Sequence, residues 1–273
     1  MERTNVNTDT EKRGKLLLIA ALIAISLFVN KILQKNVQSD IWQIYVEAGI
    51  YFVISFVGLL WAFNFQVKSK SFLYIIQAAL FVFSESIFIE FFFFQKFNRL
   101  YEALILLLLI ALVFIGNYVA FLMANVLNVG LFKKIPLIHV GRTSSYVLSL
   151  LGMYFLTFSF LLSNFNIYII LPAIMICYAL IIYVHYINIG LEGRELIWKS
   201  VLTTLISVFL FLGSFLTGTS HELIAFIPVL GYLFCVGVVS QESAYEEDKG
   251  RSWFYFILLI IIFFISLFVN ILG

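Results

Sequence analysis

Long apolar segments recur along almost the whole chain, and each is close to the length that crosses a lipid bilayer. A helical span needs about 20 mainly apolar residues, because the hydrocarbon core is about 30 Å thick. Nine segments meet this requirement and are separated by short, more polar loops. They cover residues 15–33, 41–65, 72–94, 103–128, 145–163, 167–190, 200–217, 223–240 and 253–272.

These segments must be helices if they cross lipid. Backbone donors and acceptors find no water in the hydrocarbon, which leaves helices and closed barrels as spanning structures. The segments lack the regular alternation of barrel strands. The sequence therefore predicts an all-α, polytopic membrane helix bundle with about nine transmembrane helices. The seventh and eighth segments are short and contain Gly213 and Pro228, so eight spans with one re-entrant segment is the alternative.

Composition excludes the other broad classes of protein. Hydrophobic residues make up 63% of the 273 residues and charged residues 12%, against roughly 25% charged residues in an ordinary soluble domain. Intrinsic disorder needs the opposite balance of low hydrophobicity and high charge. We expect a short cytoplasmic tail at residues 1–14 and a single transmembrane domain at residues 15–273.

The distribution of Lys and Arg predicts the orientation. Short cytoplasmic loops carry an excess of basic residues. If the N-terminus is cytoplasmic, four of the 17 basic residues fall in outer loops, namely Lys31, Lys35, Lys96 and Arg99, and the rest fall inside. Nine spans then place the C-terminus outside the cytoplasm. The formal net charge of +2 gives no indication of a nucleic-acid partner.

Ionisable residues inside the spans are the candidate functional residues, because they are costly in lipid and usually functional. They are Glu47, Glu85, Glu90 and His185, with Asn117 and Asn125 as polar companions. At about 1.5 Å per residue, Glu85 and Asn117 both fall near the middle of their spans. An unpaired carboxyl at that depth is expected to be neutral near pH 7. Glu85 is then either a protonatable or cavity-lining residue, or a neutral structural residue held by hydrogen bonds.

The same arithmetic decides which of these residues can meet. Glu47 and Glu90 fall at one level nearer the outer face, whereas His185 falls toward the cytoplasm. Glu85 and Glu90 are about 140° apart around one helix, so they do not share a face. We therefore expect Glu85 to lie level with Asn117, and Glu47 level with Glu90. The alternative for Glu47 and Glu90 is a position near the outer headgroups.

No metal or cofactor site is expected. His139, His185 and His221 fall in three different places, namely an inner loop, the inner leaflet and an outer loop. Both cysteines, Cys177 and Cys235, fall inside predicted spans, so we expect free thiols that pack as small apolar groups.

Motifs of known enzymes are absent, with one partial match. Glu246, Glu247 and Arg251 spell Glu-Glu-x-x-x-Arg, which resembles the first motif of the CAAX-protease family of membrane proteins. That family needs histidines in later spans, and no His follows position 221. We interpret these residues as a solvated charge run in a loop, and whether the protein is an enzyme is left open.

The second half of the chain contains a candidate repeat. Residues 145–172 and 200–228 each form a span, a short loop and a second span with a proline, Pro172 or Pro228. Val147, Leu148 and Leu151 match Val201, Leu202 and Leu205 at a constant offset. Repeats are frequent in transporters, although chance supplies some identities in a chain so rich in Leu and Phe.

These features favour a small multi-pass transporter, permease or flippase-like protein, with proton linkage through Glu85 as an option. The first alternative is a non-catalytic membrane partner, such as an immunity, regulatory or assembly protein. The second is an intramembrane enzyme that acts on lipid. Besides the lipid bilayer, we expect as a partner a membrane protein or an ATPase subunit, with residues 191–199 as the contact. The Ile-, Phe-, Lys- and Asn-rich composition suggests a bacterial plasma membrane.

Overall fold

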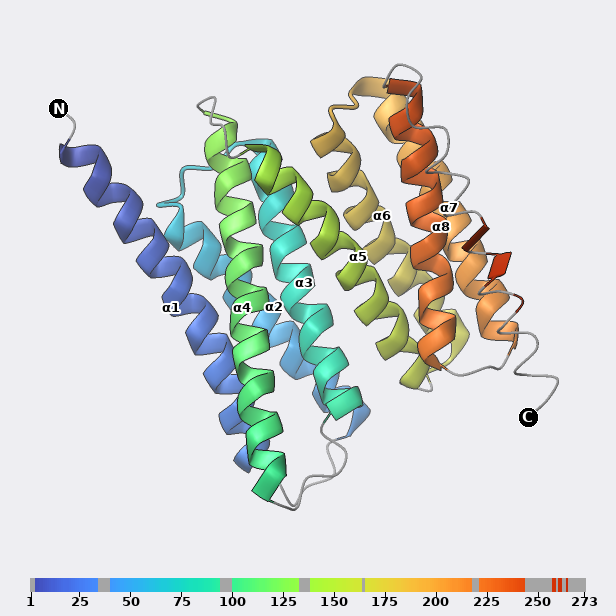
Figure 1. Ribbon diagram of the computed structural model, residues 1–273, viewed down its shortest axis with the longest axis horizontal. Coiled ribbons are helices and arrows are strands. Elements are labelled where there is room, and N and C mark those ends of the chain that lie inside the picture. The colour runs from blue at the N-terminus through green and yellow to red at the C-terminus, as the bar shows by residue number, and fades with distance from the viewer. Residues whose placement is uncertain are drawn as a thin grey trace. The chain divides into compact units, whose positions relative to one another are not determined.

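The computed structural model describes residues 3–33, 40–93, 100–132, 138–163, 165–217 and 221–243, together with five residues between 257 and 264. The six continuous ranges form eight helices (Figure 1). These are α1 (Arg3–Leu33), α2 (Ile41–Ala62), α3 (Ser69–Phe93), α4 (Leu100–Gly130), α5 (Ile138–Leu162), α6 (Ile167–Ile189), α7 (Gly193–Thr217) and α8 (His221–Ser243).

The helices confirm the predicted class of protein. Seven of them are long and apolar enough to cross a membrane, and α8 contributes a shorter apolar stretch, Leu223–Val239. The predicted segments agree with the helices to within a few residues in the apolar parts, while α1, α5 and α7 begin earlier. The ninth predicted segment, residues 253–272, and the charge run at 246–251 lie almost entirely outside the described residues. The chain is a polytopic membrane helix bundle.

Two tryptophans on α2 are spaced by about the thickness of a membrane. Trp42 and Trp61 are 59% and 44% exposed, and they stand 19 residues apart on one helix, which corresponds to about 28 Å. Tryptophan is enriched at both interfaces of a bilayer, and the separation matches a hydrocarbon core of about 30 Å. We therefore name the two membrane faces, at the two ends of α2, the Trp42 face and the Trp61 face.

The chain divides into two compact units, Met1–Leu148 and Ser149–Gly273, with the division inside α5. The first unit contains α1 to α4 and the beginning of α5. The second contains the rest of α5 and the helices that follow. The expectation of one transmembrane domain over residues 15–273 stays a prediction.

In the first unit, α1 to α4 form a closed ring in which α2 packs on α1, α3 on α2, α4 on α3, and α4 again on α1. Figure 1 shows α4 running between α1 and α3. The small residues Ala20 and Ala24 of α1 and Ala120 and Ala124 of α4 are all buried. Small side chains let helix backbones approach closely in lipid, so these buried alanines permit close packing within the ring.

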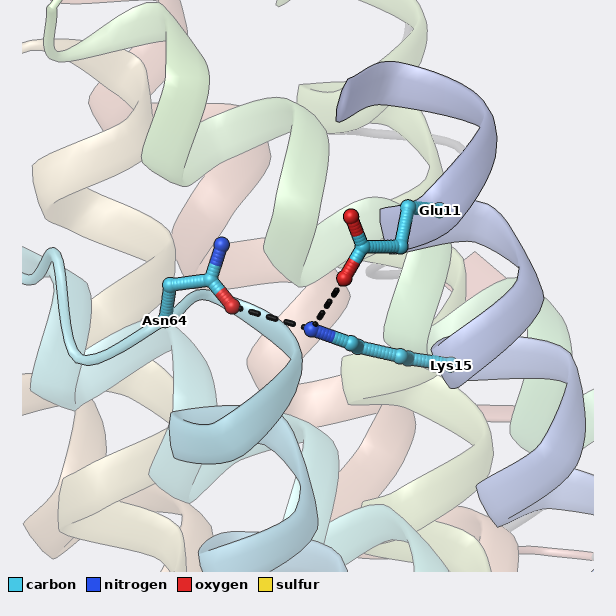
Figure 2. A network of polar contacts seen from close by, with 3 residues as sticks. All are labelled: Glu11, Lys15 and Asn64. Carbon is cyan, nitrogen blue, oxygen red and sulfur yellow. Dashed lines mark hydrogen bonds and ion pairs between the residues drawn. The ribbon is translucent and has the colours of Figure 1, made fainter. Parts of the chain in front are cut away.

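A lysine joins the first two helices at the Trp61 face. Figure 2 shows Lys15 Nζ between Glu11 Oε1 at 2.8 Å and Asn64 Oδ1 at 3.0 Å. The same ammonium lies 5.0 Å from the centre of the Trp61 ring. Asn64, in the turn after α2, has a left-handed backbone, φ 52°, a conformation that asparagine tolerates better than most residues. The turn after α2 therefore positions the lysine's partner.

In the second unit, α7 packs against both α6 and α8. Both prolines of the candidate repeat lie inside helices, Pro172 in α6 and Pro228 in α8. The two proposed hairpins differ in packing, because α7 packs closely along α8 whereas α5 and α6 are not among the closely packed helix pairs. This difference gives no support to the repeat within the described residues.

We expect Asn64→Ala to lower the thermal stability of the purified protein more than Asn64→Gly. Both variants lose the bond from Lys15, but only alanine must hold a Cβ in left-handed backbone, which costs about 1 kcal/mol. Thermal unfolding in detergent, followed by intrinsic fluorescence, measures the difference. Equal melting temperatures for the two variants would contradict this view of the turn.

The predicted orientation can be tested by cysteine labelling, with Cys177 and Cys235 replaced by alanine. Asp40 and Asn166 precede α2 and α6, whereas Gln66 and Glu192 follow them, and all four are exposed. We expect a membrane-impermeant maleimide applied to whole cells to label Asp40→Cys and Asn166→Cys but to spare Gln66→Cys and Glu192→Cys. The reverse pattern would place the N-terminus outside.

Candidate functional site

Helix α3 carries an unusual number of buried polar side chains for a membrane span. Ser84 and Ser86 donate to the carbonyls of Phe81 and Val82 in their own helix. Ser71 donates to Asn128 Oδ1 at 2.5 Å. Such bonds are needed because an unpaired polar group in hydrocarbon costs several kcal/mol.

Gln77 forms the most complete of these pairs. Its Nε2 donates to the carbonyl of Ser145 at 3.2 Å, and its Oε1 accepts from the Ser145 hydroxyl at 3.0 Å. Both residues are in the first unit and both are buried. The two bonds satisfy both ends of the amide and fix α3 against the start of α5.

Glu85 differs from the other buried polar residues of α3. It is 8% exposed, and its Oε2 has no hydrogen-bond partner among the described residues. No described Lys, Arg or His forms an ion pair with it. A carboxyl in this position is expensive in either protonation state, and residues of this kind in membranes are usually functional.

A glycine of α4 makes room for the Glu85 carboxyl. A Cβ added to Gly116 would lie 2.8 Å from Glu85 Oε1 and 3.6 Å from the ring of Phe81. The carboxyl therefore occupies the space that any other residue at position 116 would fill. Glycine thus lets the carboxyl lie directly against the backbone of α4.

Asn117, the next residue along α4, is completely buried, and both its Nδ2 and its Oδ1 lack a hydrogen-bond partner among the described residues. The structure thus brings Glu85 to the residue beside Asn117, as the depth arithmetic suggested, but the two side chains are not hydrogen-bonded. Together Glu85, Gly116 and Asn117 form what we call the α3–α4 site. It combines a carboxyl, an amide and a glycine that lets the carboxyl lie against the backbone of α4.

Counted between the ends of α3, Glu85 is four residues beyond the middle of the helix, toward Phe93, or about 6 Å. The sequence placed it nearer the midplane because the predicted segment began at residue 72, whereas α3 begins at Ser69. The site is therefore in the half of the bundle nearer the Trp42 face.

Glu47 and Glu90 belong to a second polar cluster, between α1, α2 and α3. Asn30 Nδ2 donates to Glu47 Oε2 at 2.8 Å. The Tyr51 side chain is within hydrogen-bonding range of Ser26 and Asn30 and within electrostatic range of both Glu47 and Glu90. We call these five residues the Tyr51 cluster. The neighbouring rings of Tyr45 and Phe91, 6.2 Å apart, also place this part of α2 against α3.

Sequence reasoning missed three members of the Tyr51 cluster. Ser26, Asn30 and Tyr51 are uncharged and occur in apolar segments where such residues are common. Their spacing could have indicated which of them share a helix face. Ser26 and Asn30 are four residues apart, and so are Glu47 and Tyr51. Residues at that spacing share a helix face.

His185 lies in the second unit and is 5% exposed. Its ring packs against Tyr186 of α6 and meets Tyr232 of α8 edge-on at 5.7 Å. Beside it, the Tyr186 hydroxyl bonds to Thr203 of α7 at 2.7 Å. These contacts place His185 in a buried aromatic and hydroxyl network that links α6, α7 and α8.

Both cysteines are free thiols. Among the described residues, no three His, Cys, Asp or Glu side chains gather in a way that could hold a metal ion. The chemistry available at the α3–α4 site is therefore that of a single carboxyl beside an amide. Such a pair can take up and release a proton or bind a polar group.

Comparisons with known proteins identify no relative, because no family model, no curated protein and no solved structure matches the chain. Function must therefore be argued from the arrangement of the side chains.

We expect Gly116→Ala to displace the Glu85 carboxyl without unfolding the protein, because the clashing atom is the end of a flexible side chain. Gly116→Ala should lower the melting temperature when Glu85 is present and have little effect in a Glu85→Ala background. A double-mutant cycle measures this coupling between the two positions. Gly49→Ala in α2 is the matched control, since a Cβ there meets nothing within 4 Å. Equal effects of Gly116→Ala in the two backgrounds would show that the carboxyl does not occupy this space.

Proposed function

We propose that this protein is a small multi-pass transporter of the plasma membrane in which the movement of cargo is linked to protonation of Glu85. The observation that carries the proposal is the buried Glu85 Oε2, which has no partner among the described residues. A purely structural glutamate would be expected to have its hydrogen bonds satisfied, as Gln77 does.

Two further features support transport. The carboxyl lies at the contact of two helices, and Gly116 leaves no side chain to hold it in place. A proton added to or removed from Glu85 changes which groups the carboxyl can bond to, including the unsatisfied Asn117 amide. Protonation can in this way bias the packing of α3 on α4, and a change in helix packing is what alternating access requires.

The two alternatives make different demands on these residues. A non-catalytic membrane partner, with contacts such as residues 191–199, does not need an ionisable group at position 85. An enzyme acting on lipid would use Glu47, Glu90 or His185. Among the described residues, no activated nucleophile accompanies Glu47 and Glu90 in the Tyr51 cluster, so the arrangement favours transport over this chemistry.

The first step of the test is to identify the compound that is transported. In cells that lack the gene, the toxic compounds that gain potency, or the metabolites that accumulate, identify the transported class. Complementation with wild type and Glu85→Gln, at equal membrane abundance, then tests proton linkage over pH about 5.5 to about 8. Glutamine keeps the shape of the side chain but cannot exchange a proton.

We expect Glu85→Gln to fold and insert but to lose pH-dependent transport, because the group that titrates is gone. The matched control is Glu195→Gln, which removes an exposed carboxylate that pairs with Lys199 on α7 and should behave as wild type. Full activity of Glu85→Gln at every pH would sink proton linkage and favour the non-catalytic partner.

A further inference from the structure

We propose that Glu85 exchanges its proton with the Trp42 face of the membrane, through Ser86 and the Tyr51 cluster, and that Glu90 and Tyr51 are the residues that set this route. The inference rests on the proposed function, since it names the side from which the carboxyl of the α3–α4 site is reached. The evidence for it is that ionisable groups of α3 lie closer to Glu85 toward the Trp42 face than toward the Trp61 face.

Toward the Trp42 face, polar groups follow Glu85 at short intervals. Ser86 is the next residue, and it shares a helix face with Glu90 because the two are four residues apart. Glu90 is five residues from Glu85, or about 7.5 Å along the axis. The distance from Glu85 to the first ionisable group on this side is thus about one and a half helical turns.

The Tyr51 cluster continues the path from Glu90 into α2 and α1. Tyr51 is 8% exposed and lies in range of both carboxylates and of Ser26 and Asn30. Glu47 is five residues from Trp42 on α2, about 7.5 Å from that end of the span. Ser26 is exposed. The cluster therefore extends from the level of Glu90 to the surface of the helix ring.

Toward the Trp61 face, α3 offers little that could carry a proton. On this side Ser84 adjoins Glu85, and its hydroxyl donates to the carbonyl of Phe81. Between Ser84 and Tyr74, Gln77 is the one polar residue of α3, and its amide is bonded to Ser145 at both ends. Tyr74, the first titratable group on this side, is 11 residues from Glu85, about 16 Å.

Among the described residues, the end of α3 at the Trp61 face is positively charged. Arg142 acts electrostatically on Tyr74, and a fixed positive charge opposes the passage of protons. Lys68 and Lys70 follow at the start of α3, and Lys15 lies at the same end of α1. Around the Tyr51 cluster, the described titratable groups are Glu47, Glu90, Tyr51 and Tyr45, whose ring neighbours that of Phe91. On α4, Tyr118 is the titratable residue nearest Asn117 in sequence.

The experiment measures the protonation of Glu85 from each face separately. Dicyclohexylcarbodiimide adds to a protonated carboxyl buried in a membrane, and peptide mass spectrometry reports how much of Glu85 is modified. The full-length protein is reconstituted in vesicles of one orientation, sorted by a cysteine label at Asp40→Cys. The pH is then varied between about 5.5 and about 8 on one face while the other face is held constant.

In wild type we expect modification of Glu85 to fall several-fold as the pH on the Trp42 face rises, and to change little with pH on the Trp61 face. Tyr51→Phe and Glu90→Gln should slow or remove the response. Tyr74→Phe is the matched control, because it removes a buried hydroxyl from the competing side of Glu85, and it should respond as wild type.

The route would be overturned if modification of Glu85 followed the pH on the Trp61 face. It would also be overturned if Tyr74→Phe removed the pH response and Tyr51→Phe left it intact. In both cases Glu85 would remain the group that exchanges the proton. Modification that is indifferent to pH on both faces would contradict the route and the proposed function together. Correct folding of each variant is checked by its melting temperature and by labelling of Asp40→Cys from the Trp42 face.

Discussion

The constraint on which this structure depends is the pairing of polar groups in a medium without water. Helices satisfy their own backbone, so the apolar segments can cross the membrane, but each polar side chain on them needs a partner. The first unit supplies these partners across helices: Asn128 for Ser71, Ser145 for Gln77, and Asn30 for Glu47. Packing of α3 against α2, α4 and α5 can be understood as the solution to this requirement.

Against that background, the α3–α4 site stands out because the requirement is not met there. Glu85 Oε2 and the Asn117 amide are buried without partners among the described residues, although they come from helices in contact. Buried groups of this kind store free energy that a change of protonation, or a bound polar group, can release. A transporter alternates between two arrangements of its helices that differ little in free energy. A helix contact whose polar groups are all hydrogen-bonded in one arrangement would favour that arrangement strongly.

Much of the fold could be predicted from the sequence, because the length of an apolar segment and the thickness of a bilayer are both set by simple physics. The starts of α2 and α6 were predicted to the residue, and their ends to within three residues. The start of α3 was misplaced by three residues, because Ser69, Lys70 and Ser71 look like a loop. The helix includes them because Ser71 bonds to the backbone of Lys68 and to Asn128.

The candidate site was only partly predictable. Helical rise gave the levels of Glu85 and Asn117 and of Glu47 and Glu90, but it could not give the rotation of each helix about its axis. Rotation decides that Glu85 lies against Gly116 rather than in a bond with Asn117, and that Tyr51 comes within range of two carboxylates. Those contacts depend on side chains from several helices, which no single segment encodes.

The central claim is that the buried carboxyl of Glu85 changes its protonation state within the pH range in which the protein works. Infrared difference spectroscopy of the purified protein, recorded between low and high pH, observes this directly as the C=O stretch of a protonated carboxylic acid. The account predicts a C=O band of a carboxylic acid in apolar surroundings. This band should disappear from the wild-type spectrum as the pH rises, and it should be missing from the spectrum of Glu85→Gln. Identical difference spectra for wild type and Glu85→Gln would contradict it.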